Sequence, residues 1–165
     1  MSAKISIITV VYNNKDFIEG AIKSVLSQDY NNIEYIIIDG GSTDGTLDII
    51  AKYKSQINIL VSEKDDGLYD AMNKGYELAS GDIIGILNSD DLFYSNQCLS
   101  KIAFSFESYT SLDIVYGNLV YVKRDDISHI VRQWNSGDYY NNYFLDGFTP
   151  AHPSVYVRSH VIKNF

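Results

Sequence analysis

Three short apolar runs limit the folds open to this chain, because each run ends abruptly in polar residues. The runs cover residues 5–11 (ISIITVV), 33–38 (IEYIII) and 83–87 (IIGIL). Largely apolar runs of this length are typical of strands buried on both faces of a parallel sheet. A further strand is expected at residues 57–61, and amphipathic helices are expected at residues 15–28, 43–54, 69–79 and 97–106. This alternation predicts repeated βαβ units, that is, an α/β fold with a mainly parallel sheet and flanking helices.

The pattern changes after Ser111. Residues 113–123 and 127–134 are β-rich and flank a polar turn, which predicts a C-terminal antiparallel hairpin. Residues 135–147 are polar, aromatic and irregular, so we expect them to be mobile or to contact a partner. At Phe165 the pattern of helices and strands is unfinished, which predicts a C-terminally truncated piece of a longer protein.

The composition argues against several classes of function. At 165 residues the chain fits a single domain with a substantial core. Its formal net charge of -8 argues against broad nucleic-acid binding, although a local basic pocket for phosphate remains compatible. One cysteine rules out an internal disulfide framework and favours a reducing compartment. Because the sequence shows neither a signal peptide of the usual form nor an apolar run of about 20 residues, we expect a cytoplasmic location.

Polar residues follow three of the predicted strands at the point where each strand ends. Residues 9–14 close the first strand, Asp39 follows the second, and Asp90 and Asp91 follow the run at 83–87. Because the carboxyl ends of parallel strands meet at one edge, these residues should converge where open α/β sheets bind ligands. Carboxylates at that edge suit a nucleotide together with Mg²⁺ or Mn²⁺. The alternative for Asp90 and Asp91 is a strand-end turn and the N-cap of the next helix.

Other nucleotide and nucleophile sites lack their motifs. The sequence contains no G-x-G-x-x-G after the first strand, no G-x-x-x-x-G-K-[ST] and no G-x-S-x-G. A dinucleotide site, a P-loop and an α/β-hydrolase nucleophile are therefore disfavoured. His129, His152 and His160 show no metal-ligand spacing with the cysteine. Elimination leaves a metal-assisted nucleotide site, and a nucleotidyltransferase stays open as an alternative, although its usual Gly-rich basic loop is missing.

The segments TVVYNN, IIIDGGSTDGT and DGLYDAMNKGYELASGDIIGILNSDD, in this order, resemble family 2 glycosyltransferases of the A-type fold. The resemblance covers nearly all of residues 5–92 and extends to bacterial transferases that assemble surface polysaccharides. It implies that Thr9 and Tyr12 lie near the nucleotide base and that Asp39 binds the base. It also places Ser89-Asp90-Asp91 at the family's D-x-D motif, which makes Asp90 and Asp91 the expected ligands of Mn²⁺ or Mg²⁺.

The same resemblance puts the segment DGLYDAMNKG beside the donor, near its sugar or diphosphate. A helix N-terminus favours an anion there, and Lys74 would offset phosphate charge. The alternative is that Asp70 caps the helix and Lys74 is solvated, and the residues alone do not separate the two. Nucleotide-sugar binding is therefore expected at Thr9, Tyr12, Asp39, Asp66, Asn73, Lys74, Ser89 and Asp90.

For the reaction, the resemblance implies inverting transfer of a sugar from a nucleoside-diphosphate sugar, with a UDP-sugar favoured, to a hydroxyl of a saccharide or lipid-linked saccharide. Lipid-linked acceptors would bring a peripheral contact with the membrane.

The resemblance further implies a catalytic Asp or Glu downstream of an element like residues 150–158 (PAHPSVYVR), and no counterpart precedes Phe165. Asp138 and Asp146 are nearby acids that fit loop roles better. We therefore expect a donor-binding half at residues 1–110 and an incomplete acceptor-side region at residues 111–165. A donor-binding fragment without turnover stays as the alternative.

Overall fold

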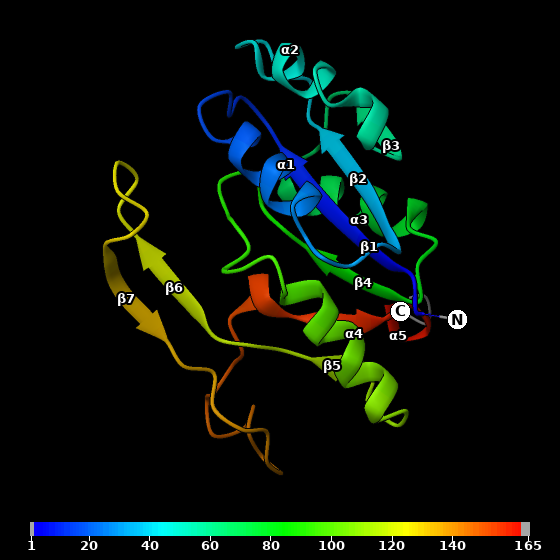
Figure 1. Ribbon diagram of the computed structural model, residues 1–165, viewed down its shortest axis with the longest axis vertical. Helices are drawn as coiled ribbons and strands as arrows, with labels where there is room; N and C mark the ends of the chain where they lie inside the picture. The colour runs from blue at the N-terminus through cyan, green and yellow to red at the C-terminus, as the bar shows by residue number, and fades with distance from the viewer. Residues whose placement is uncertain (1, 163–165) are drawn as a thin grey trace.

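The computed structural model describes residues 2–162 and contains one six-stranded sheet with helices on both faces (Figure 1). The strand order is β3-β2-β1-β4-β8-β5, and the strands are Ile59–Ser62, Ile33–Asp39, Ile5–Val11, Ile83–Ile86, Tyr156–Arg158 and Ile114–Val115. The helices are α1 (Ile18–Leu26), α2 (Thr46–Ala51), α3 (Leu68–Leu78), α4 (Cys98–Ser108) and α5 (Ser159–Ile162). A separate hairpin pairs β6 (Leu119–Val122) with β7 (Ile130–Trp134). The predicted α/β class, the mainly parallel sheet and the C-terminal hairpin are confirmed.

The three apolar runs form the centre of the sheet. Every residue of β1 is buried, and its side chains alternate between two hydrophobic clusters. Ile7 and Val11 face the cluster that α1, α2 and α4 cover, whereas Ile8 and Val10 face α3. Burial on both faces explains why these runs lack polar alternation. In the part of the chain that the structure describes, no helix has both the length and the apolar character needed to cross a bilayer.

Two helices are shorter than their sequence pattern predicts. Helix α1 begins at Ile18 rather than at residue 15, after a turn in which the carbonyl of Asn14 accepts the N–H groups of Phe17 and Ile18. The side chain of Asn14 does not cap the helix, because it donates to Ser89 Oγ at 2.7 Å instead. The second predicted helix is likewise broken into α2 and a 3₁₀ turn, η1 (Lys54–Gln56).

The C-terminal part contributes more to the sheet than the pattern predicts. The strand expected at residues 113–123 is split, because β5 joins the main sheet while β6 forms the hairpin. Strand β8, which the sequence reading missed, is inserted between β4 and β5 and runs antiparallel to both. It follows a 3₁₀ turn, η2 (His152–Ser154). Residues after 111 therefore complete the same sheet that residues before 110 begin.

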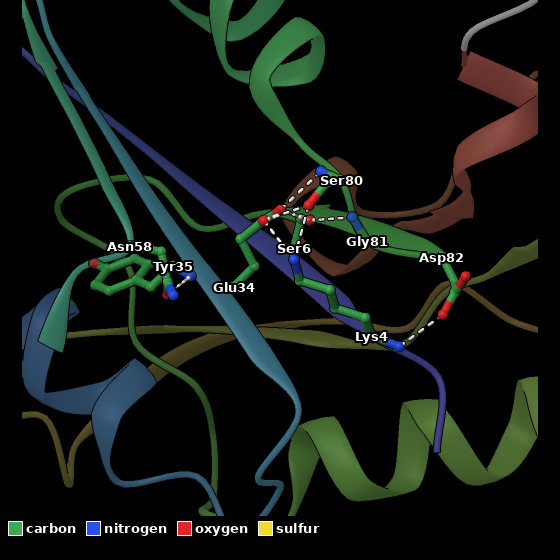
Figure 2. Close-up of polar contacts among 8 residues, drawn as sticks. All are labelled: Lys4, Ser6, Glu34, Tyr35, Asn58, Ser80, Gly81 and Asp82. Carbon is green, nitrogen blue, oxygen red and sulfur yellow. Dashed lines mark hydrogen bonds and ion pairs between the residues drawn. The ribbon is translucent and has the colours of Figure 1, made fainter. Parts of the chain in front are cut away.

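A buried carboxylate joins strands and helix at the amino end of the sheet (Figure 2). Glu34 is 5% exposed, and its oxygens accept hydrogen bonds from Lys4 Nζ at 2.6 Å, Ser6 Oγ at 2.5 Å and Ser80 Oγ at 2.5 Å. Burial opposes ionisation, but these donors outweigh it and lower the pKa of Glu34 from 4.5 to about 2. Ser6 also accepts the N–H of Gly81, so the cluster ties β1 and β2 to the turn between α3 and β4.

We expect Glu34→Gln to lower the free energy of unfolding at pH 7 by about 2 kcal/mol, because the amide leaves Lys4 without its counter-charge. The depressed pKa means that the carboxylate stabilises the fold above pH 4.5 and that this contribution, of about 3 kcal/mol, is lost as the pH falls from 4.5 towards 2. Urea unfolding at pH 7 and pH 2.5 measures both effects. The exposed Glu77→Gln serves as the control. If the free energies of unfolding of the wild type and Glu34→Gln differed as much at pH 2.5 as at pH 7, the ionic role of Glu34 would be contradicted.

Candidate functional site

The carboxyl ends of β1, β2 and β4 bring the predicted polar residues to one edge of the sheet. Val11 is paired with Asp39 in the parallel register of β1 and β2, and Tyr12 follows directly. Three loops at this edge are tied together by side chains. Asn13 accepts the N–H of Thr43 at 2.8 Å, and Asn14 donates to Ser89 at 2.7 Å. This bonding fixes the loop after β1 against the loops after β2 and β4.

Asp39 is a fully buried carboxylate at this edge, with 0% of the residue exposed. Its Oδ2 accepts hydrogen bonds from Ser62 Oγ at 2.7 Å and from the N–H groups of Ser42 at 3.1 Å and Gly41 at 3.2 Å. Its Oδ1 has no partner among residues 2–162. An unpaired buried carboxylate oxygen is costly, so the site is suited to an N–H donor from a ligand.

Asp90 and Asp91 occupy a tight turn directly after β4. Asp90 is exposed, whereas Asp91 is half-buried and accepts the side-chain amide of Asn88 at 2.8 Å. Burial is the main cause of a raised pKa at Asp91, and the charge of Asp90 adds to it, while Asn88 and His152 oppose it. The N-cap alternative is wrong, because the next helix begins at Cys98 and its N-cap position is Gln97.

These two carboxylates fit a divalent cation in part. Within residues 2–162 no three His, Cys, Asp or Glu side chains are grouped as a complete metal site. Mg²⁺ is commonly held by one or two carboxylates, with phosphate oxygens of the substrate completing its shell. Asp90 and Asp91 supply hard oxygen ligands of that kind. Their donor chemistry therefore suits a cation shared with a diphosphate.

Lys74 is neither solvated nor free. Its Nζ lies 2.5 Å from Asp65, 2.9 Å from Glu63 and 3.1 Å from Asp70. Hydrogen bonding, foremost to Asp65, raises the pKa of Lys74. Its positive charge is therefore already balanced by three carboxylates. Asp70 is not the N-cap of α3, because that position is Gly67. Its side chain accepts the backbone N–H of Asp66 at 3.1 Å instead.

Asp65 is a site residue that the sequence reading missed. Its side chain is only 7% exposed, and its Oδ2 lies against Gly40, which directly follows Asp39. Asp66, the residue singled out from the sequence, is exposed. Adjacent aspartates offer no local signal that separates them, because only the direction of each side chain in the loop differs. Asp65 therefore brings Lys74 and the start of α3 to the strand-end site.

The remaining predicted residues lie at different depths. Tyr12 is 65% exposed beside Gly40, and Asn73 is exposed on α3. Ser89 is 8% exposed and holds Asn14. Thr9 is 0% exposed, and its hydroxyl lies 3.2 Å from that of Tyr35 inside the sheet. The side chain of Thr9 therefore faces the core, and its expected place near the nucleotide base stays a prediction.

Sequence comparison relates the chain to enzymes that transfer sugars. Residues 6–159 match the family model described as "Glycosyl transferase family 2". The PGL/p-HBAD biosynthesis glycosyltransferase of Mycobacterium tuberculosis (strain ATCC 25177 / H37Ra) is 33% identical over 118 residues, covering 70% of this chain and 46% of the relative. The putative teichuronic acid biosynthesis glycosyltransferase TuaG of Bacillus subtilis (strain 168) is 37% identical over 106 residues, covering 62% of this chain and 42% of TuaG. The chain spans about half the length of these curated relatives.

Solved structures share the fold at low identity. S. aureus TarS 1-349 in complex with UDP-GlcNAc matches with a TM-score of 0.74 and 21% identity, over 98% of this chain and 47% of that one. Mannosyltransferase PcManGT from Pyrobaculum calidifontis, in complex with GDP-Man and Mn2+, matches with a TM-score of 0.65 and 18% identity, over 99% and 52%. These likenesses confirm the predicted A-type fold. The match of residues 6–159 to the family model shows that the chain belongs to glycosyl transferase family 2.

Proposed function

We propose that this chain transfers a sugar from a nucleoside-diphosphate sugar to an acceptor hydroxyl in the biosynthesis of a polysaccharide. The observation that carries the proposal is the buried Asp39, whose Oδ1 has no partner in the described part of the chain and lies at the edge that also carries Asp90 and Asp91. A nucleobase supplies the N–H donor that Asp39 lacks, and a diphosphate supplies the oxygens that a cation at Asp90 and Asp91 would share. One ligand of this class meets both requirements.

The donor would lie across the strand ends. Its base would contact Asp39 and the exposed ring of Tyr12, and its diphosphate would lie near Asp90 and Asp91. Asp65 and Lys74 would lie on the sugar side of the donor. If the donor displaced one of the three carboxylates that pair with Lys74, the ammonium group of Lys74 could bind a phosphate oxygen instead. A bound Mn²⁺ or Mg²⁺ would neutralise the leaving diphosphate. UDP-GlcNAc and GDP-Man in the complexes of TarS and PcManGT support a nucleotide-sugar donor, and we favour a UDP-sugar.

We propose transfer with inversion, which needs a base for the acceptor hydroxyl. Asp138 and Asp146 are poor candidates for the catalytic base. Both are exposed in the irregular segment at residues 135–147, and Asp146 accepts a hydrogen bond from the hydroxyl of Tyr140 at 3.0 Å. We keep the division into a donor-binding half at residues 1–110 and an acceptor-side region at residues 111–165. A second candidate function is donor binding without turnover, favoured by a chain that spans about half the length of its relatives. Membership of the transferase family removes the nucleotidyltransferase alternative.

Calorimetric titration with UDP, with and without Mn²⁺, tests the proposal. We expect UDP to bind with a dissociation constant in the micromolar range, about -8 kcal/mol, and chelation of the cation to weaken binding at least about tenfold. Titration with GDP on the same preparation reports the base preference. A radiolabelled sugar-transfer assay then separates an active transferase from a donor-binding chain. Absence of saturable binding by either nucleotide would contradict the proposed function.

A further inference from the structure

The hairpin β6–β7 stands apart from the main sheet (Figure 1), and each of its ends contacts another segment of the fold. At its tip, the guanidinium of Arg124 lies 5.0 Å from the ring centroid of Phe17, in the loop that follows Tyr12. At its base, the N–H of Gly117 donates to Ser154 Oγ at 3.2 Å, in the η2 turn that also carries His152. The hairpin therefore flanks the edge at which the donor is proposed to bind.

One face of the hairpin presents an arginine between two aromatic rings. Arg132 is paired directly opposite Tyr121, and Trp134 follows two residues later on the same face of the strand. The guanidinium carbon of Arg132 lies 5.5 Å from the ring centroid of Trp134 and 5.6 Å from that of Tyr121. Contacts of this geometry hold a guanidinium in place while its N–H edges stay available.

Arg132 has no carboxylate partner within the residues described, in a chain whose net charge is -8. The contrast with Arg158 is informative, because Arg158 donates to the carbonyls of Leu112 at 2.7 Å and Phe106 at 3.0 Å and thereby serves the fold. Within residues 2–162, Arg132 donates no side-chain hydrogen bond to a backbone carbonyl, and its guanidinium contacts are those with the two rings. Its fork of N–H donors matches a carboxylate or phosphate bidentately, and flanking aromatic rings offer apolar faces for a sugar ring.

We propose that the hairpin face formed by Tyr121, Arg132 and Trp134 binds an oxyanion, carboxylate or phosphate, carried by the acceptor saccharide. This inference rests on the proposed function and adds to it the chemical class of the acceptor. A saccharide is favoured over an anionic lipid surface, because membrane attachment through charge needs a cluster of about four to eight basic residues. The hairpin offers Lys123, Arg124 and Arg132, and its turn also carries Asp125 and Asp126.

Fluorescence provides a direct test, because Trp134 is the single tryptophan of the chain. The probes are an oligoglucuronate, a glycerol phosphate oligomer and a neutral glucose oligomer of equal length, each titrated to about 10 mM. We expect a saturable change with at least one of the charged oligomers, weakened by raising the salt from 50 to 200 mM, and none with the neutral one. The charged oligomer that binds distinguishes carboxylate from phosphate.

Variants assign the binding to Arg132. We expect Arg132→Gln to weaken binding of the charged oligomer at least about tenfold, and Arg132→Lys to recover part of it, since lysine keeps the charge but not the bidentate fork. Lys101→Gln, on the exposed side of α4, is the matched control and should bind as the wild type does. Equal binding of the neutral oligomer, unchanged binding by Arg132→Gln, no saturable change, or binding only to phosphatidylglycerol vesicles would each overturn the inference.

The donor titration separates this inference from the function on which it rests. Arg132→Gln is expected to bind UDP with Mn²⁺ as tightly as the wild type, because Arg132 lies on the hairpin and not at the strand ends. If the wild type binds UDP but neither charged oligomer, the acceptor inference alone is overturned. If the wild type binds no nucleotide, the proposed function itself is overturned.

Discussion

Replacing Asp90 and Asp91 together with alanine is expected to weaken Mn²⁺-dependent binding of UDP about 100-fold or more, equivalent to about 2.8 kcal/mol. The two carboxylates are hard oxygen ligands in the loop after β4, and a cation shared with the diphosphate would lose its protein ligands without them. Removing one partner from a close charge interaction typically costs about 2–5 kcal/mol. Calorimetry at saturating Mn²⁺ measures the change in affinity. Binding of UDP in the presence of a chelator should change little, because that binding does not use the cation.

An adjacent pair of aspartates outside the strand-end site serves as a matched control for this variant. Asp125 and Asp126 are exposed in the turn of the β6–β7 hairpin and carry the same charge. Asp125→Ala/Asp126→Ala should therefore leave the affinity for UDP within about twofold of the wild type. If the Asp90/Asp91 variant bound UDP and Mn²⁺ as tightly as this control does, the proposed metal site would be wrong.

Gly85→Ala is expected to lower the free energy of unfolding by about 3 kcal/mol, the upper end of the usual range for overpacking. Gly85 is paired with Tyr156 across β4 and β8, and the ring of Tyr156 lies over it. A Cβ at Gly85 would come to 2.5 Å from Cδ1 and 3.0 Å from Cζ of that buried ring. Neither the strand backbone nor a side chain that is 4% exposed moves away easily. For a chain of this size the melting temperature should fall by about 9 °C.

Urea unfolding checks this stability prediction, since a lower midpoint with an unchanged slope reports a loss of stability alone. Gly117→Ala is the matched control, because a Cβ at Gly117 meets no atom within 4 Å, and its midpoint should stay close to that of the wild type. Gly85→Ala combined with Tyr156→Val should recover part of the loss by removing the ring that clashes. If Gly85→Ala and Gly117→Ala unfolded at the same urea concentration, the close approach of the Tyr156 ring would not limit stability.

One local rule was enough to predict that acidic residues from separate segments lie at the same edge of the sheet. Asp39, Asp90 and Asp91 were located by their position directly after apolar runs, and the structure places all three at the same edge. Residues that follow parallel strands lie at the same edge because the carboxyl ends of those strands share that edge. This holds independently of the side chains within the strands. Thr9 differs from these residues, since it lies inside a fully buried strand and its side chain faces the core.

Residues whose role depends on distant partners were beyond sequence reasoning. Asp65 and Asp66 are chemically identical neighbours, and only the loop conformation turns Asp65 towards Gly40 and Lys74. Strand β8 has two partners, β4 and β5, which lie about 70 and 40 residues earlier in the chain. Nothing within its own three residues specifies that pairing. The positions of α1 and α2 were predicted, but the residue at which each begins depends on bonds between loops: Asn14 donates its side-chain amide to Ser89, and Thr46 accepts the N–H of Asn14.

The sequence by itself determined the three central strands, where their polar ends fall and which family the motifs resemble, because hydrophobic periodicity and motif spacing are local properties. The tertiary structure alone decided which atoms remain without partners. Asp39 keeps one oxygen without a partner from residues 2–162, because Ser62, Ser42 and Gly41 all donate to the other. Arg132 keeps its N–H donors because two rings, and no carboxylate among the described residues, surround it. Unmet hydrogen-bonding capacity depends on every neighbour in space, so it becomes visible only once the chain is folded.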